Sequence, residues 1–146
     1  MKSRYTISRP VFAILPALAV LALALAPAAP LSAQESDADM LRQVFENQPP
    51  VTAAEVPVAL EILAASKKDS PPEETLALGA KAGMDERRVM FVTSKLMAAF
   101  LMLKLGSTAE ATGEQMRTPL AVPTPEELDV LRPHMDAMAT IMELNQ

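Results

Sequence analysis

The chain has 146 residues, a formal net charge of −5, ten methionines and no cysteine or tryptophan. The lack of cysteine excludes thiol catalysis, thiolate metal sites and disulfides. The acidic balance argues against nucleic acids and anionic membrane surfaces as partners, because both bind basic faces.

Residues 1–33 have the layout of a secretory signal peptide, with a basic start, an apolar run and a tail of small residues and proline. The basic residues are Lys2, Arg4 and Arg9. We place the cleavage after Ala33, and a cut after Ala28 is the alternative. An uncleaved membrane anchor is the competing interpretation, which the short apolar run disfavours. We therefore expect a periplasmic or secreted protein of bacterial type.

Residues 34–146 would then form a single helical domain of about 113 residues, enough for one core. Without the three basic residues of the signal, ten basic residues stand against eighteen acidic ones, for a formal charge of −8. The only aromatic residues of this domain are three phenylalanines, so its core must consist of Leu, Ala, Val, Ile and Met. We expect no stable membrane insertion once the signal is removed.

In chain order, the first predicted helix begins with Ser36 as its N-cap and stops at Pro49 and Pro50, which have no amide hydrogen to donate. A Thr-x-x-Glu capping box over 52–55 predicts the start of the second helix. Pro57 lies about one turn further on, so we expect either a bend there or a later start.

A second capping box, over 70–73, predicts a third helix that ends at Gly83 in a left-handed conformation. Asp85 is the expected N-cap of the longest helix, Glu86–Leu105, which Gly106 should end. These four helix boundaries are predicted from local capping chemistry alone.

The apolar residues of the helix over 86–105 recur at spacings of three and four and form three adjacent stripes. A helix that is apolar on nearly all sides is buried by its neighbours, so we expect the other helices to cover it. Lys95 and Lys104 leave only eight residues between them, which disfavours a membrane-spanning helix.

Residues 107–123 are rich in Ser, Thr, Gly and Glu, contain two prolines and show no sustained period, so we predict a mobile loop. A capping box over 124–127, with proline at the first helical position, begins the last helix. Pro133 should kink this helix because it removes the hydrogen bond to the Asp129 carbonyl. The predicted fold is all-α, a small bundle of about five helices packed around one long central helix.

One candidate site is a stripe of soft ligands on the last helix. It consists of His134, Met135, Met138 and Met142. Thioethers and one imidazole could bind Cu(I) in a compartment without thiols. The alternative is plain core packing, because methionine is a flexible filler on helix faces.

Catalysis is not expected. Four adjacent or near pairs of acidic residues stand at predicted helix starts, where capping and the helix dipole explain them. Acid–base catalysis needs two carboxyl groups facing each other across a substrate, and nothing in the sequence indicates such a pair. We therefore predict neither an enzyme nor a cofactor.

The apolar surplus of the long helix is the second candidate site. If the shorter helices leave one stripe bare, that surface should bind a partner protein, a second copy in a homodimer, or a small apolar ligand. The residues concerned are Met90, Met97, Leu101, Met102 and Leu105. A closed monomeric bundle is the alternative.

The threonine-led helix starts at 51–55 and 124–128 resemble the LTxxQ-type periplasmic stress chaperones, with Glu55 and Glu127 where that family has Gln. The resemblance covers these two segments and no more of the chain. We expect a non-enzymatic protein-interaction or holdase-like module. The rival hypotheses are copper binding through the His/Met stripe and carriage of an apolar ligand.

Overall fold

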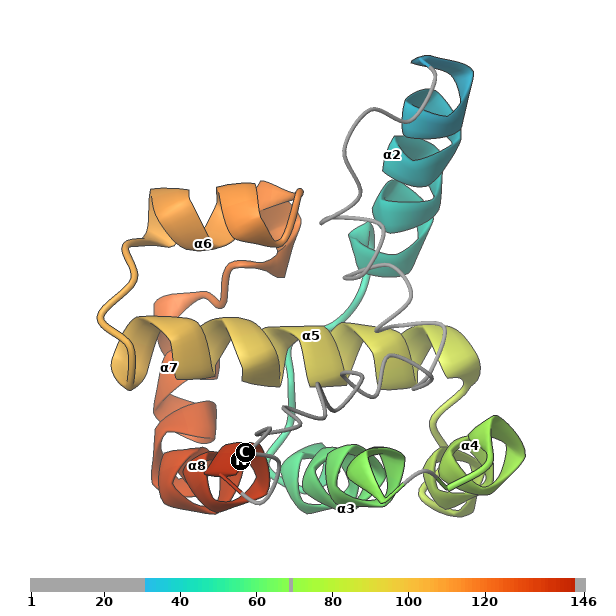
Figure 1. The fold of residues 1–146 in the computed structure, drawn as a ribbon, viewed down its shortest axis with the longest axis vertical. Helices are drawn as coiled ribbons and strands as arrows, with labels where there is room; N and C mark the ends of the chain where they lie inside the picture. Colours follow the sequence, from blue (N-terminus) through green and yellow to red (C-terminus); the bar gives the residue numbers. More distant parts are fainter. Residues whose placement is uncertain (1–30, 69, 144–146) are drawn as a thin grey trace, which may run out of the picture.

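A computed structural model describes residues 31–68 and 70–143 of the chain, with side chains from residue 37 onward. Every regular element in these ranges is helical, which confirms the predicted all-α class (Figure 1). The elements are α2 (Leu31–Phe45), α3 (Glu55–Lys67), α4 (Pro72–Lys81), α5 (Glu86–Leu103), α6 (Ala109–Gln115), η1 (Pro119–Ala121), α7 (Pro125–Leu131), η2 (Arg132–His134) and α8 (Met135–Glu143). Residues 1–30, which hold most of the predicted signal peptide, lie outside the described residues.

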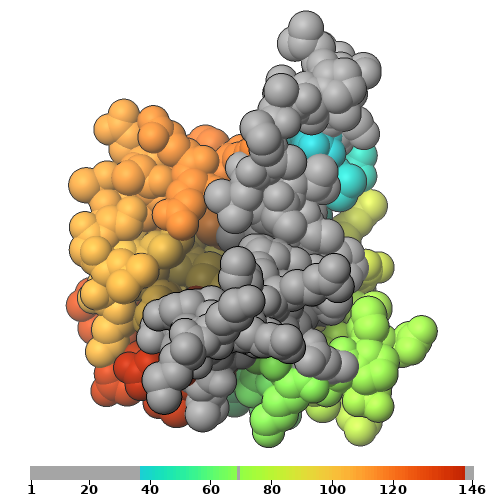
Figure 2. Space-filling view, in the orientation of Figure 1, coloured from blue at the N-terminus to red at the C-terminus, as the bar shows by residue number. Residues whose placement is uncertain are grey.

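Helix α5 runs across the molecule and packs against α2, α3, α4, α6, α7 and α8 (Figure 1). α2 and α6 lie on one side of it, and α3, α4 and α8 lie on the other. In the same orientation, the space-filling view shows α6 at the upper left, with α8 and α4 at the lower corners (Figure 2). Twelve of the 18 residues of α5 are buried, including the polar ones at 93–95.

Among the described residues, no helix has both the length and the apolar character that crossing a membrane requires.

Several helix ends follow the predicted local chemistry. The Asp85 carboxylate accepts a hydrogen bond from the Arg88 amide at 2.8 Å, which caps α5. Gly83 and Gly106 have φ of 76° and 70°, the left-handed conformation that glycine adopts without a steric penalty. The capping box that begins α7 is complete, because Thr124 and Glu127 each accept an amide hydrogen bond from the other.

The interruption predicted at Pro133 is also present. α7 ends at Leu131, the chain continues as the 3-10 helix η2, and α8 begins at Met135. Because Pro133 cannot donate an α-helical hydrogen bond, the tighter turn replaces it at this point.

Two predicted helix starts were wrong in position, and a third follows the predicted alternative. α2 is already helical from Leu31, so Ser36 lies inside the helix and does not cap it. α3 begins at Glu55 rather than at residue 52, which confirms the alternative of a later start and places Pro57 in the first turn. α4 begins at Pro72 without a side-chain cap, because a residue that precedes proline is driven out of the helical region, as the ψ of 144° at Pro71 shows.

The loop predicted over 107–123 instead contains α6 and η1. Thr108 caps α6 by accepting a hydrogen bond from the Ala111 amide at 3.1 Å, and Thr118 caps η1 in the same way. Met116 and Ala121 are buried and anchor this segment in the core. The prediction failed because a helix of seven residues is too short to show an apolar period.

Gly79 sets how closely α4 approaches α5. It is buried within α4, and a Cβ at this position would collide with the Val89 Cγ2 of α5. The Val89 side chain is itself 1% exposed and β-branched, so it has little room to move. A glycine is therefore required here by packing, although glycine weakens a helix interior.

We expect Gly79→Ala to destabilise the protein by about 1–3 kcal/mol, through overpacking that outweighs the helix propensity of alanine. Urea unfolding followed by circular dichroism measures the change. Val89→Ala removes the colliding methyl groups, so the double variant Gly79→Ala/Val89→Ala should cost clearly less than the sum of the two single variants. A stabilising Gly79→Ala would contradict the contact.

Candidate functional site

Apolar side chains stay exposed where α2 meets η1. Among the described side chains, the large apolar ones that remain exposed are Met40 at 43%, Leu105 at 65% and Leu120 at 47%. Met40 belongs to α2 and Leu120 to η1, and these two elements pack together. Leu105 follows the end of α5 and belongs to neither. We use the name α2–η1 surface for Met40 and Leu120, the exposed large apolar side chains of these two packed elements.

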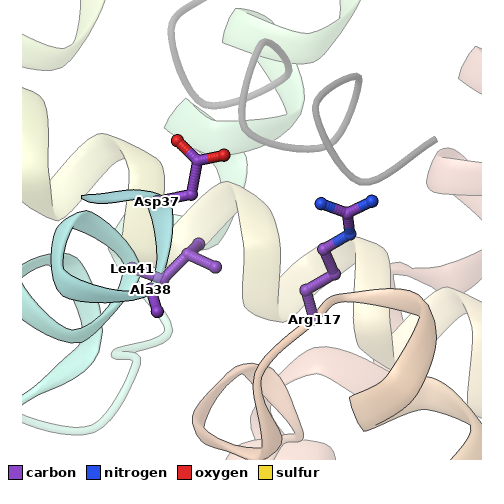
Figure 3. A pocket seen from close by; sticks show the side chains of 4 residues that line it. All are labelled: Asp37, Ala38, Leu41 and Arg117. Atoms are coloured by element: carbon purple, nitrogen blue, oxygen red, sulfur yellow. The ribbon is translucent and has the colours of Figure 1, made fainter. Parts of the chain in front are cut away.

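A surface pocket of about 280 Å³ opens between α2 and the turn that follows α6. It is lined by Asp37, Ala38, Leu41 and Arg117. Figure 3 shows Asp37, Ala38 and Leu41 on α2 at one side and Arg117 on the separate turn at the other. The pocket is therefore lined by one acidic, one basic and two apolar side chains.

Arg117 also lines a second surface pocket, of about 390 Å³, together with residues of α6 and Pro119 of η1. Its backbone has a φ of 57°, a left-handed conformation that costs a residue with a side chain on the order of 1 kcal/mol. Such outliers concentrate at functional positions, although turns also contain them. The turn places one guanidinium at the edge of both pockets.

Two ion pairs and one aromatic ring form a second cluster, which we call the polar seam. Its residues are Glu55, Arg88, Phe91, Lys95 and Glu127. Arg88, Phe91 and Lys95 follow one another on α5 at spacings of three and four, so they share one face of the helix. The Arg88 Nε lies 2.6 Å from Glu55 Oε1, and the Lys95 Nζ lies 3.0 Å from Glu127 Oε2. Both cations sit over the Phe91 ring, at 4.9 and 5.3 Å from its centroid.

The polar seam holds the connection between α2 and α3. Arg88 donates hydrogen bonds to the carbonyl oxygens of Pro49 and Pro50. The Val51 amide donates to Glu127 Oε1 at 3.3 Å. Since proline has no amide hydrogen, these carbonyl contacts are the main polar means of fixing the Pro49–Pro50 segment on α5.

The Lys95–Glu127 pair is almost fully buried, with side chains 6% and 3% exposed. Lys95 also donates to the Val122 carbonyl at 2.9 Å, and Glu127 accepts from the Thr124 amide at 2.9 Å. A buried ion pair is tolerated only when such additional hydrogen bonds satisfy its remaining donors and acceptors. This pair therefore ties α5 to the start of α7 in one specific arrangement.

Glu55 is held ionised by its partners. Burial of the carboxylate raises its pKa, but hydrogen bonds from Arg88 and from the Thr52 amide and hydroxyl more than offset this, so the pKa of Glu55 lies below its usual value. The Arg88 contact is bidentate, with a second bond of 2.7 Å from Nη2 to Oε2. Bidentate charged pairs of this kind are among the stronger hydrogen bonds in proteins.

The structure does not bring the predicted α5 residues together as one bare stripe. Met90 and Leu101 are buried at 7% and 9% exposure. Met97 and Met102 are half-buried, and Leu105 is exposed beyond the end of the helix. Of these five residues, only Leu105 is freely available to a partner in this conformation.

The His/Met stripe is divided between two environments. His134 is half-buried at the end of η2, directly before α8, which contains the three methionines. Met135 and Met138 are buried in the core at 3% and 0% exposure. The Met142 sulfur lies 3.3 Å from the Lys67 Nζ, and burial lowers the pKa of Lys67. An ammonium beside this thioether competes with any cation for the sulfur.

Among residues 37–68 and 70–143, no group of three or more His, Cys, Asp or Glu side chains is placed to hold a metal ion.

Neither the polar seam nor the position of Arg117 beside the two pockets was predicted from the sequence. Lys95 appeared only as an interruption of an apolar helix, yet a lone charge on a helix that must be buried predicts a buried partner. Glu127 was assigned to a capping box alone, although a carboxylate has a second oxygen to offer. No pattern in the sequence distinguishes Arg117.

Comparison with protein-family models, with curated proteins and with solved structures found none that matches this chain.

Proposed function

We propose that this is an exported, non-enzymatic protein that binds an apolar segment of a partner protein, in the manner of a holdase. In this proposal, residues 1–33 are the export signal and α5 is the central helix of a small bundle. The contact with the partner is made by the α2–η1 surface. The observation that carries the proposal is the exposure of Met40 and Leu120 on two elements that pack together. The pocket lined by Asp37 and Arg117 opens at the same helix, α2.

The chemistry of this surface suits an unfolded polypeptide segment. Exposed methionine and leucine side chains adapt to partners of different shape. Asp37, at the edge of the pocket between α2 and the turn after α6, offers a carboxylate that can accept hydrogen bonds from the amides of an extended chain. Apolar contact combined with backbone recognition favours apolar segments without requiring one sequence.

Catalysis and carriage of a small apolar ligand have less support. Among the described residues, Asp37 is the one carboxylate that lines the pocket between α2 and the turn after α6. No second carboxylate lines that pocket to act with it. The two described pockets open to the surface, whereas a carrier of small apolar ligands encloses most of the ligand.

The test is suppression of aggregation. A thermally unfolding client enzyme is followed by light scattering with and without an equimolar amount of the purified protein. We expect the protein to reduce the scattering and the variant Met40→Glu/Leu120→Glu to lose most of this effect, because two charges would then occupy the contact surface.

Leu105→Glu is the matched control, since it introduces the same charge at an exposed leucine outside the α2–η1 surface. It should protect the client as well as the unmodified protein. The proposal fails if the unmodified protein does not protect any client. It also fails if Leu105→Glu and the double variant lose protection to the same extent.

A further inference from the structure

Among the described side chains of α2, those of residues 37–45, the buried ones lie near the C-terminal end of the helix. Leu41, Val44 and Phe45 are buried at 7%, 5% and 7% exposure, whereas residues 38–40 are exposed. Figure 1 shows the helix rising away from α5, with only its C-terminal end against the rest of the fold. Within the described chain, its principal packing partners are α5 and η1.

α3 differs in each respect. It packs against α4, α5 and α8, and its buried residues extend from Val56 to Ser66, nearly its full length. It lies across α5 from α2 (Figure 1). Segments with few buried apolar contacts open at a lower free energy than segments embedded among several neighbours. The two helices that follow each other in the chain are thus expected to differ in local stability.

The turn at the end of α2 is the candidate hinge. The helix stops at Phe45, and Asn47 takes a left-handed φ of 60°. Immediately after it, Arg88 holds the carbonyls of Pro49 and Pro50, and Glu127 holds the Val51 amide. The polar contacts of the connection thus begin after the hinge.

The described side chains of α2 make apolar contacts that would break on opening. The Phe45 ring lies 5.8 Å from the Phe91 ring in a tilted arrangement, and Leu41 and Val44 are buried beside it on α2. The ion pairs of the polar seam join α5 to residues after the hinge, so they can stay intact while α2 moves.

We propose that α2 is a hinged arm, which opens from α5 and η1 as a unit while the polar seam keeps the rest of the described fold closed. Opening uncovers Leu41, Val44 and Phe45 on the arm and Phe91 on α5. This inference goes beyond the proposed function, because it concerns motion within the protein alone and needs no partner.

The absence of cysteine in the natural sequence allows single thiols to report the opening. Val44→Cys places a buried thiol on the arm, and Val56→Cys places one on α3 by the same chemical change. Each variant of the purified protein is labelled with an excess of a thiol reagent over a range of low urea concentrations. The arm thiol should react at least about tenfold faster, with a shallower dependence on urea, because less surface is exposed in its opening.

A second substitution in the body of the fold tests independence. Ile62→Val, at a fully buried position of α3, should accelerate labelling of the Val56→Cys thiol by about two- to tenfold. It should leave the rate of the Val44→Cys thiol unchanged, since arm opening does not break contacts of Ile62. Equal rates for the two thiols, or an equal response of both to Ile62→Val, would show that α2 opens only with global unfolding and would overturn the proposal.

Discussion

Glu127→Gln is expected to lower the free energy of unfolding by about 3–5 kcal/mol, the largest effect we expect from a single substitution in this protein. The variant keeps the size of the side chain, but its one oxygen can replace only one of the two carboxylate oxygens, which accept separately from the Val51 and Thr124 amides. It removes the charge that faces Lys95 at 3.0 Å in a site where both side chains are almost fully buried. The ammonium is then left in the interior without a counter-charge. Chemical denaturation at neutral pH measures the loss.

The matched control is a shorter but exposed ion pair. The Lys104 Nζ lies 2.6 Å from Asp136 Oδ1, yet the Asp136 side chain is 93% exposed. Water screens such a pair, so Asp136→Asn should leave the unfolding midpoint unchanged. If Glu127→Gln and Asp136→Asn lowered the free energy of unfolding equally, burial would not explain the contribution of the Lys95–Glu127 pair to stability.

The double variant Lys95→Met/Glu127→Gln, compared with the single variants Lys95→Met and Glu127→Gln, forms a double-mutant cycle. Methionine fills a similar volume and removes the buried ammonium, so the combined loss should be clearly smaller than the sum of the single losses. Additive losses would show that Lys95 and Glu127 act independently.

Arg88→Met is expected to cost about 2–4 kcal/mol of unfolding free energy. The substitution removes both bonds to Glu55, the bonds to two proline carbonyls, and the cation over the Phe91 ring, while it keeps an apolar side chain of similar length. Arg87→Met is the control, because it is the same change at the adjacent, exposed position of α5. It should have little effect, since surface substitutions away from specific contacts seldom do.

The Arg88 effect should depend on pH in one direction. Because the pKa of Glu55 in the folded protein is below its usual value of 4.5, its contribution to stability is fully present above that value and is lost as the pH falls through the folded pKa. The difference in stability between the natural protein and Arg88→Met should therefore be largest near neutral pH and should shrink in acid. A difference that grew in acid would contradict the assigned Arg88–Glu55 contact.

The helix ends show what local chemistry can predict. Asp85 and Thr124 were identified from the sequence as caps, and both act on amides within three residues. The predicted start of α4 was wrong because two local rules competed there. Pro71 and Pro72 override the capping signal of Ser70. α6 was not predicted because a helix of seven residues is too short to show an apolar period.

The candidate sites were predicted less well, for a reason that the α5 stripes illustrate. Periodicity correctly indicated that α5 is apolar on most sides, and it placed Met90 and Leu101 among residues that must be covered or bind something. It could not tell which neighbour covers each stripe. The structure buries these two residues and leaves Met40 and Leu120 exposed instead.

By itself, the sequence determined the all-α class and several helix ends, because capping, proline geometry and apolar period act over a few residues. Only the tertiary structure decided that Lys95 meets Glu127, that Gly79 lies against Val89, and that Arg88 holds the segment before α3. These contacts join residues of different elements. Their formation depends on how whole helices pack against one another, which no local pattern encodes.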